Sequence, residues 1–198
     1  MKFILSLLIL IFSSLLQAQS VSYKLSMPKP QNHYFHVEME LEDFNEKEID
    51  ISLPVWAPGS YLVREFSKNI NMVKAFDEKG NPLEIKKQRK NSWTINTSKN
   101  NKVVVKYEVY AFELSVRTSF LDLTHGYVSG SGVFMFVEGH LDSSGQLKIV
   151  PFEGFSTVST ALPEAKSKFE FSYTDYDHLV DCPIEIGNQQ IFDFNAAG

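Results

Sequence analysis

The residues best suited to binding chemistry lie in one segment, 53–66, which reads Leu-Pro-Val-Trp-Ala-Pro-Gly-Ser-Tyr-Leu-Val-Arg-Glu-Phe. Two prolines and a glycine restrict the backbone of this proline corner, and Trp56 and Tyr61 add large apolar rings. Arg64 and Glu65 place opposite charges beside the rings. Because exposed rings gain nothing in water, the composition predicts a corner that packs against something. It either plugs one end of a β-structure, or it presses against another domain or lines a cleft.

A second segment with binding potential is 126–132, Gly-Tyr-Val-Ser-Gly-Ser-Gly, just before an apolar run. Its glycines would let a backbone approach a ligand closely, which makes Tyr127, Gly130 and Ser131 candidates for a ligand or domain contact. A bulge or a wide turn explains the same glycines equally well. Ser131 is not in a nucleophile elbow, because that motif requires Gly-x-Ser-x-Gly between a strand and a helix.

The sequence contains no complete catalytic or metal site. A hydrolase needs a nucleophile, a base and a charge-stabilising group held together, and the His-Glu-x-x-His pattern of a helical zinc site is absent. His33 and His36 are three residues apart, which puts them on opposite faces of a strand. The single Cys182 has no His or Lys beside it and is expected to be a packed, inert thiol. We therefore expect no catalytic residue, metal ligand or cofactor in this chain, and a self-contained hydrolase is the weakest hypothesis.

Strands must position these candidates. Between residues 33 and 42, apolar and polar residues alternate with the period of a strand that has one buried and one wet face. The run 133–137 is apolar throughout, as expected of a strand covered on both faces. The pattern indicates an all-β fold, a β-sandwich-like two-sheet domain with a short helix after the proline corner, within 61–70. Other predicted elements are strands near 49–53, 72–76, 83–85, 93–96, 103–112, 147–150 and 169–173, and a helical turn at 176–181.

The N-terminus has the pattern of a secretory signal. Lys2 is followed by an apolar run, 3–16, and Leu16-Gln17-Ala18 offers a small residue for cleavage, so residues 1–18 are predicted to be a signal peptide. An uncleaved anchor is the alternative, although the run is shorter than the roughly 20 residues of a membrane span. The mature chain is expected to be exported to a periplasm or beyond, without membrane contact after cleavage.

The charge and the length bound the remaining possibilities. The net charge of −5 argues against a nucleic-acid partner, which would require a basic face. The short basic run at 86–90 fits a solvated hairpin face. One domain is expected over 19–186, long enough to bury its own core without disulfides. Residues 187–198 contain the strand signal Ile-Phe-Asp-Phe at 191–194 and are predicted to start a connection to further polypeptide.

Four segments in order carry a family resemblance: 23–35 (with Tyr-Lys-Leu-Ser-Met-Pro), the proline corner, 133–139 and 175–187. The corner and the Asp-x-Pro-x-Glu-x-Gly motif at 181–187 are the specific parts. Together they resemble the N-terminal domain of the glycyl-aminopeptidase-type zinc metallopeptidases, metallopeptidase family 61, over nearly all of the mature chain.

This resemblance implies a β-rich domain in front of a helical, thermolysin-like catalytic domain, often followed by a PDZ domain. In such enzymes zinc polarises the scissile carbonyl and activates water. All zinc ligands would lie beyond Gly198, so zinc is expected in the missing catalytic domain and not in this chain. The implied partners are the catalytic domain of the same polypeptide and a peptide substrate.

By analogy with related aminopeptidases, the resemblance also implies that an acidic side chain of this domain helps bind the substrate's free amino group. Glu65 is the candidate, with Arg64 as its competitor or orienting partner. The alternative is a plain ion pair between Arg64 and Glu65, or one across an interface. The proline corner and the loop 127–132 then become candidates for facing the catalytic cleft.

Two functional hypotheses result. The first is a non-catalytic N-terminal domain of an exported zinc metallo-aminopeptidase, which supports the catalytic domain and shapes the peptide cleft. The second is a free-standing periplasmic β-sandwich that binds peptide or glycan through Trp56 and Tyr61. The second requires a preformed groove beside exposed rings, whereas the first requires a reading frame that continues past codon 198.

Overall fold

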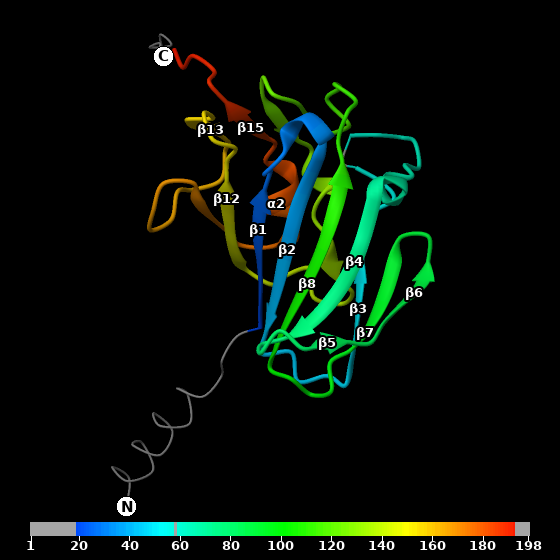
Figure 1. The fold of residues 1–198 in the computed structure, drawn as a ribbon. Helices are drawn as coiled ribbons and strands as arrows, with labels where there is room; N and C mark the ends of the chain where they lie inside the picture. The colour runs from blue at the N-terminus through cyan, green and yellow to red at the C-terminus, as the bar shows by residue number, and fades with distance from the viewer. Residues whose placement is uncertain (1–18, 58, 193–198) are drawn as a thin grey trace, which may run out of the picture.

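The structure is a computed structural model that describes residues 19–57 and 59–192. The predicted signal peptide, 1–18, and the end of the predicted connection, 193–198, lie outside the described residues. A large sheet forms one layer, and two smaller sheets and a short α-helix lie behind it (Figure 1). None of the helices in the described residues is long and apolar enough to cross a membrane.

The large sheet has seven strands in the order β14-β12-β1-β2-β8-β4-β5. All its neighbouring strands are antiparallel except β1 and β12, which run parallel. The alternation predicted at 33–42 is confirmed in β2, whose odd-numbered side chains are buried while the even-numbered ones face the other side. The strand bounds are β1 (Ser20–Ser26), β2 (Tyr34–Glu42), β4 (Ile70–Asp77), β5 (Pro82–Leu83), β8 (Lys102–Tyr110), β12 (Gly145–Val150) and β14 (Glu170–Tyr173).

The two smaller sheets have the orders β11-β3-β7-β6 and β13-β15-β10-β9. Their strands are β3 (Glu48–Ser52), β6 (Ile85–Arg89), β7 (Ser92–Asn96), β9 (Phe120–Leu121), β10 (Gly126–Val128), β11 (Phe136–Val137), β13 (Thr157–Ser159) and β15 (Ile184–Gly187). The predicted all-β, sandwich-like fold is confirmed, with three sheets in place of two.

The helical elements are short. The turn predicted at 176–181 is the α-helix α2 (Tyr176–Asp181), which begins where Asp175 Oδ1 accepts a hydrogen bond from the His178 N–H at 2.8 Å. The helix expected after the proline corner is only the 3-10 turn η2 (Phe66–Asn69). Two further 3-10 turns are η1 (Pro30–Asn32) and η3 (Gly130–Gly132).

The apolar run 133–137 is buried as predicted except for the half-buried Phe136, but only its last two residues form a strand. Buried tyrosine hydroxyls take the place of strand partners. The Tyr107 hydroxyl donates to the Val133 carbonyl at 2.9 Å and accepts from the Met135 N–H at 3.1 Å. The Tyr176 hydroxyl donates to the Phe134 carbonyl at 2.7 Å. The prediction of a five-residue strand is therefore wrong, because side chains satisfy this buried backbone.

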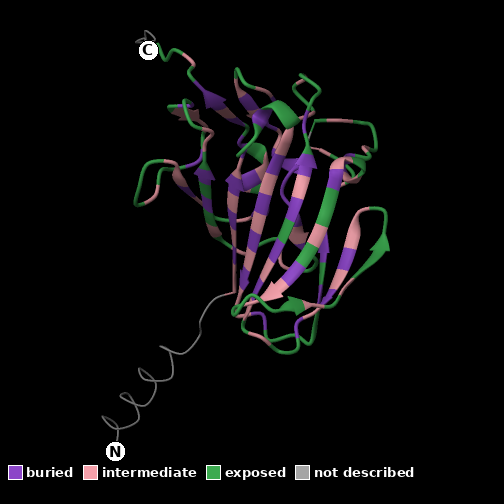
Figure 2. Cartoon of the chain, viewed as in Figure 1, coloured by how far each residue is buried: buried purple, intermediate pink, exposed green. Residues whose placement is uncertain are grey.

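The sandwich has two distinct ends. The upper end in Figure 1 consists of the loops 27–33, 53–65, 111–119 and 122–125 and the segment 188–192. The lower end consists of the turns 43–47, 78–81, 97–101 and 138–144. Figure 2 shows that both ends carry exposed residues, whereas buried residues alternate along the strands between them.

Candidate functional site

The proline corner leaves the upper end of β3 and is closed at its base. The Leu53 N–H donates to the Asn91 carbonyl at 2.8 Å, and Asn91 Nδ2 donates to the Leu53 carbonyl at 2.7 Å. Across the loop, the Arg64 N–H donates to the Val55 carbonyl at 2.6 Å. The base of the corner is therefore held by hydrogen bonds to Asn91 and by one backbone hydrogen bond across the loop.

The aromatic side chains of the corner's tip are exposed. Trp56 is 53% exposed and Tyr61 is fully exposed. The Trp56 indole N–H donates to the Ser60 carbonyl, which fixes the orientation of the ring. The other exposed large apolar residues of the tip are Val55, Leu62 and Val63. The alternative that the corner plugs this chain's own core therefore fails for Trp56 and Tyr61, whereas Phe66, at the end of the corner, is buried in the core.

Arg64 and Glu65 form no ion pair with each other in the described structure. Arg64 Nη2 donates to Ser60 Oγ at 3.3 Å, but its Nε is buried and has no acceptor among the described residues. Glu65 instead accepts from Lys90 Nζ at 2.9 Å, and this contact lowers the pKa of the Glu65 carboxyl. The Glu65 side chain is 66% exposed, so water screens its pair. Arg64 thus has unused hydrogen-bonding capacity, and Glu65 is an ionised surface carboxylate.

The three candidate residues of segment 126–132, the glycine loop, lie on different structural elements. Tyr127 is the middle residue of β10 and is half-buried, whereas Ser131 is buried in η3. A Cβ on Gly130 would lie 2.8 Å from the Cα of Val180 in α2, so close packing explains this glycine. Whether Tyr127, Gly130 or Ser131 faces a substrate stays a prediction.

The glycine loop touches the end of the proline corner. A Cβ on Gly132 would lie 3.5 Å from Cδ1 of Phe66, the buried residue that ends the corner. The fold therefore brings these two predicted segments together at that point.

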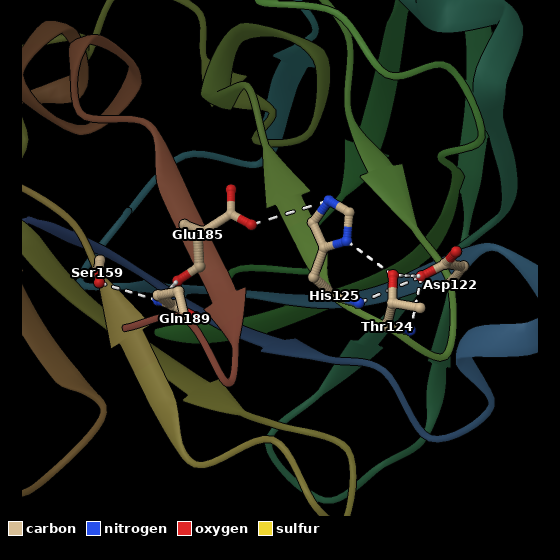
Figure 3. Close-up of polar contacts among 6 residues, drawn as sticks. All are labelled: Asp122, Thr124, His125, Ser159, Glu185 and Gln189. Atoms are coloured by element: carbon tan, nitrogen blue, oxygen red, sulfur yellow. Dashed lines mark hydrogen bonds and ion pairs between the residues drawn. The ribbon is translucent and has the colours of Figure 1, made fainter. Parts of the chain in front are cut away.

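Tyr127 stands beside a carboxylate that the sequence reasoning did not single out. In register, Tyr127 lies between Glu185 of β15 and Phe120 of β9. Ser159 of β13 is on the other side of Glu185. The Glu185 carboxylate points toward the imidazole of His125, with 3.9 Å between Oε1 and Nε2 (Figure 3). The signal available was the alternation of this glutamate with two isoleucines at 184–186, which predicts a strand with one outward side chain.

The residues drawn in Figure 3 form the Glu185 cluster. Two of its acceptors, the Glu185 carboxylate and Gln189 Oε1, have no hydrogen-bond donor among the described residues. Partial burial raises the pKa of Glu185, and the charge of a protonated His125 opposes the rise. His125 Nδ1 lies 2.9 Å from Thr124 Oγ1. Gln189 Nε2 donates to Ser159 Oγ at 2.9 Å, while its buried Oε1 has no donor among the described residues. Figure 3 shows the cluster on strands β13 and β15, in the loop between β9 and β10 and in the segment after β15.

The described residues contain no group of three or more His, Cys, Asp or Glu side chains placed to hold a metal ion. Cys182 is buried and has no disulfide, and burial raises the pKa of its thiol. A raised pKa disfavours the reactive thiolate, in line with the packed thiol expected from the sequence.

Exposed apolar side chains collect at the upper end beyond the corner. The additional ones are Phe112, Leu114, Val116, Leu123, Ile191 and Phe192. At the lower end, Leu141 is the one large apolar residue exposed among those described. Ile191 and Phe192 belong to no strand, so the strand predicted at 191–194 is not seen in its described half. A concentration of exposed apolar side chains at one end is typical of a surface that binds another molecule.

Similarity to known proteins identifies the family. A family model, the Peptidase M61 N-terminal domain, matches residues 22–188. The chain belongs to the M61 peptidase family. The matched M61 domain takes in every strand of the fold, β1 from its third residue on.

A crystal structure of an aminopeptidase N family protein from Idiomarina loihiensis is similar to the M61 domain, with a TM-score of 0.84 and 33% sequence identity. The similarity covers 90% of this chain and 31% of that one, so the chain spans less than a third of that protein's length. A search of curated proteins gives no match.

Proposed function

We propose that this M61 domain is the non-catalytic N-terminal domain of an exported zinc metallo-aminopeptidase. It supports the catalytic domain and shapes the peptide cleft. The observation that carries this proposal is the exposed apolar upper end, above all Trp56 and Tyr61. Burying such side chains against a second domain stabilises the contact by about 25 cal/mol per Å² of apolar surface.

Zinc belongs, in this proposal, to the catalytic domain. The described residues do not fit a zinc site, because zinc takes three or four protein ligands and no group of three donors is present among them. The His125–Glu185 pair offers only two donors. We assign this chain no step of peptide hydrolysis; its part is to hold the catalytic domain and to bound the space in which the peptide lies.

The free amino group of a peptide has two candidate acceptors on this domain. Glu65 is mostly exposed and already accepts from Lys90. Glu185 is less exposed, and among the described residues its carboxylate has no donor within hydrogen-bond distance. An ammonium group gains more from a partly desolvated carboxylate than from a solvated one. Glu185 is therefore the stronger candidate, although the sequence pointed to Glu65.

Export is supported by the signal pattern at 1–18. The apolar run and the small residue at its end have the features that a signal peptidase recognises. The proposal places the mature domain in a periplasm or outside the cell.

A second candidate function is a free-standing module that binds peptide or glycan. The exposure of Trp56 and Tyr61 favours it, because both rings are available to a ligand. Against it, two open hollows found among the described residues, of about 1050 and about 700 Å³, are lined by residues other than these two rings. A binding module would instead need a groove formed beside these rings.

The test begins by sequencing the reading frame beyond codon 198. The zinc binding and peptidase activity of its full product are then compared with those of the 198-residue chain. We expect the full product to contain His-Glu-x-x-His, to bind zinc and to cleave aminoacyl reporter substrates. The 198-residue chain, supplied with zinc, should show no turnover. A stop codon directly after Gly198 would remove the enzymatic part of the proposal, and turnover by the short chain would overturn its division of labour.

A further inference from the structure

A basic hollow lies beside the proline corner. It is an open concavity of about 700 Å³ lined by Glu65, Ser67, Lys68 and residues 87–90. Four of these seven residues are basic and one is acidic, in a chain with a net charge of −5. The basic hollow is therefore a local positive region on a negatively charged protein.

Most of this positive charge is not neutralised by the chain. Lys90 pairs with Glu65, but Lys68, Lys87 and Arg89 form no ion pair within the described part of the chain. Lys87 Nζ lies 5.0 Å from the centroid of the Trp93 ring, which helps orient its ammonium group. Three cations are thus available to an acidic partner.

The basic hollow and the corner form one continuous surface. β6, which carries Lys87 and Arg89, is the edge strand of its sheet. The turn after β6 holds the base of the corner through the two hydrogen bonds between Asn91 and Leu53. The Glu65–Lys90 pair joins the other end of the corner to the same turn. A partner that covers the corner's tip would therefore also face the hollow.

We propose that the corner's tip and the basic hollow are one docking surface, and that its occupant is an acidic surface of the catalytic domain. This inference rests on the proposed function. The exposed rings of Trp56 and Tyr61 enter an apolar recess, and carboxylates of the catalytic domain face Lys68, Lys87 and Arg89. Docking is therefore sensitive to salt.

A lysine-rich edge strand has a second known use, because its charges prevent edge-to-edge pairing between protein molecules. That role accounts for Lys87 and Arg89 on β6. It does not account for Lys68, which lies in η2 after the corner and not on the edge strand. The experiment below separates the two roles.

The test uses the intact peptidase polypeptide with a protease site placed after residue 190, in the segment that follows β15. Once the folded protein is cleaved, only non-covalent contacts hold the two pieces together. Their dissociation constant is measured by analytical ultracentrifugation at about 50 and about 500 mM NaCl, where screening differs strongly. We expect the constant to rise at least about tenfold at the higher salt concentration.

Charge-reversal variants test whether the salt dependence of association comes from the basic hollow. The double variant Lys87→Glu with Arg89→Glu should weaken association at low salt about 100-fold and lose most of the salt dependence. The matched control is Lys79→Glu with Lys99→Glu, which reverses two exposed charges at the lower end and should leave association unchanged. Circular dichroism melts would check that both variants fold.

The outcomes separate the two proposals. Pieces that stay together equally well at both salt concentrations and in the Lys87/Arg89 variant would overturn the acidic occupant, but not docking itself. Pieces that separate at once in every form would overturn the proposed supporting function. If the Lys87/Arg89 variant only self-associates, with an unchanged dissociation constant, the charges protect the edge strand and the inference is wrong.

Discussion

At the lower end of the sandwich the described turns leave one large apolar side chain exposed, whereas the turns of the upper end leave many exposed. In the turn after β4, Asp77 Oδ1 accepts from the backbone N–H groups of Lys79 and Asn81 at 2.9 and 2.8 Å. In the proline corner the backbone is equally well closed, yet the Trp56 and Tyr61 rings remain exposed and Arg64 Nε has no described acceptor. The lower end is complete by itself, whereas the exposed aromatic side chains of the upper end are typical of a surface that binds another protein.

The largest effect that we expect comes from removing the two exposed rings of the upper end. The double variant Trp56→Ala with Tyr61→Ala should weaken association of the cleaved peptidase about 100-fold, since buried aromatic residues dominate interfaces. In the 198-residue chain the same variant should change the free energy of unfolding by less than about 1 kcal/mol, because the rings are exposed. Urea unfolding measures the second quantity, and a loss of several kcal/mol there would show that the rings belong to the domain's own core.

The opposite pattern is expected at the lower end. The buried Thr97 hydroxyl donates to the Glu46 carbonyl at 2.5 Å and accepts from the Lys99 N–H at 3.1 Å. Thr97→Ala should lower the free energy of unfolding by about 1–3 kcal/mol, because it removes the buried hydroxyl that links the backbones of two turns. Association with the catalytic domain should not change.

The matched control for this variant is Thr94→Ala, which removes an exposed hydroxyl contact with Asp50. It should change stability by less than about 0.5 kcal/mol. Equal effects of the two threonine variants, or weaker docking of Thr97→Ala, would contradict the idea that this end is complete by itself.

A smaller effect is expected from the two carboxylates that could bind the substrate's amino group. In the intact peptidase, Glu185→Gln should raise KM several-fold, on the order of tenfold, with kcat nearly unchanged, because it removes a ground-state contact with the substrate's amino group. Glu65→Gln should have a weaker effect, since Glu65 is solvated and paired with Lys90. Steady-state kinetics with aminoacyl substrates decide between them; a larger effect of Glu65→Gln would move the amino-group site to the proline corner.

The smallest expected effect is a pH dependence of the 198-residue chain. Burial raises the folded-state pKa of Glu185 above 4.5, so the folded protein holds this proton more tightly than the unfolded chain does. The resulting stability is present below the unfolded pKa and is lost as the pH rises through the folded one. The charge of a protonated His125 opposes this rise in the pKa of Glu185.

Glu185→Gln keeps a neutral side chain at every pH. Its stability relative to the wild type should therefore increase between about pH 4 and about pH 7, as measured by urea unfolding at both values. A difference between the two proteins that is the same at both pH values would show that Glu185 has no raised pKa.

Sequence patterns predicted the strands that alternate, because one face of each meets the core and the other meets water. β2, β3, β7 and β8 were found in this way. The strands β10 and β15 were not predicted, because they are short and the alternation of Glu185 with its two isoleucine neighbours covers only three residues; pairing with each other stabilises both strands. The run 133–137 was predicted as buried but with the wrong backbone, since distant tyrosines replace its strand partners.

The candidate site was predictable only in part. The composition of the proline corner showed that it must contact something, but whether its rings turn inward or outward depends on hydrogen bonds to Asn91, far along the chain. The sequence neighbours Arg64 and Glu65 suggested a mutual pair, and the fold gives Glu65 to Lys90 instead. Glu185 and His125 are 60 positions apart, and only the sheet brings them together.

The central claim is that the upper end is covered by the catalytic domain, and hydrogen exchange tests it most directly. Backbone amide exchange would be compared between the 198-residue chain and the intact peptidase, followed by mass spectrometry. We predict that peptides covering 55–63 and 112–118 exchange at least about tenfold more slowly in the intact peptidase, while those covering 78–81 and 97–101 exchange equally in both. Equal exchange at the two ends in both proteins would contradict the account.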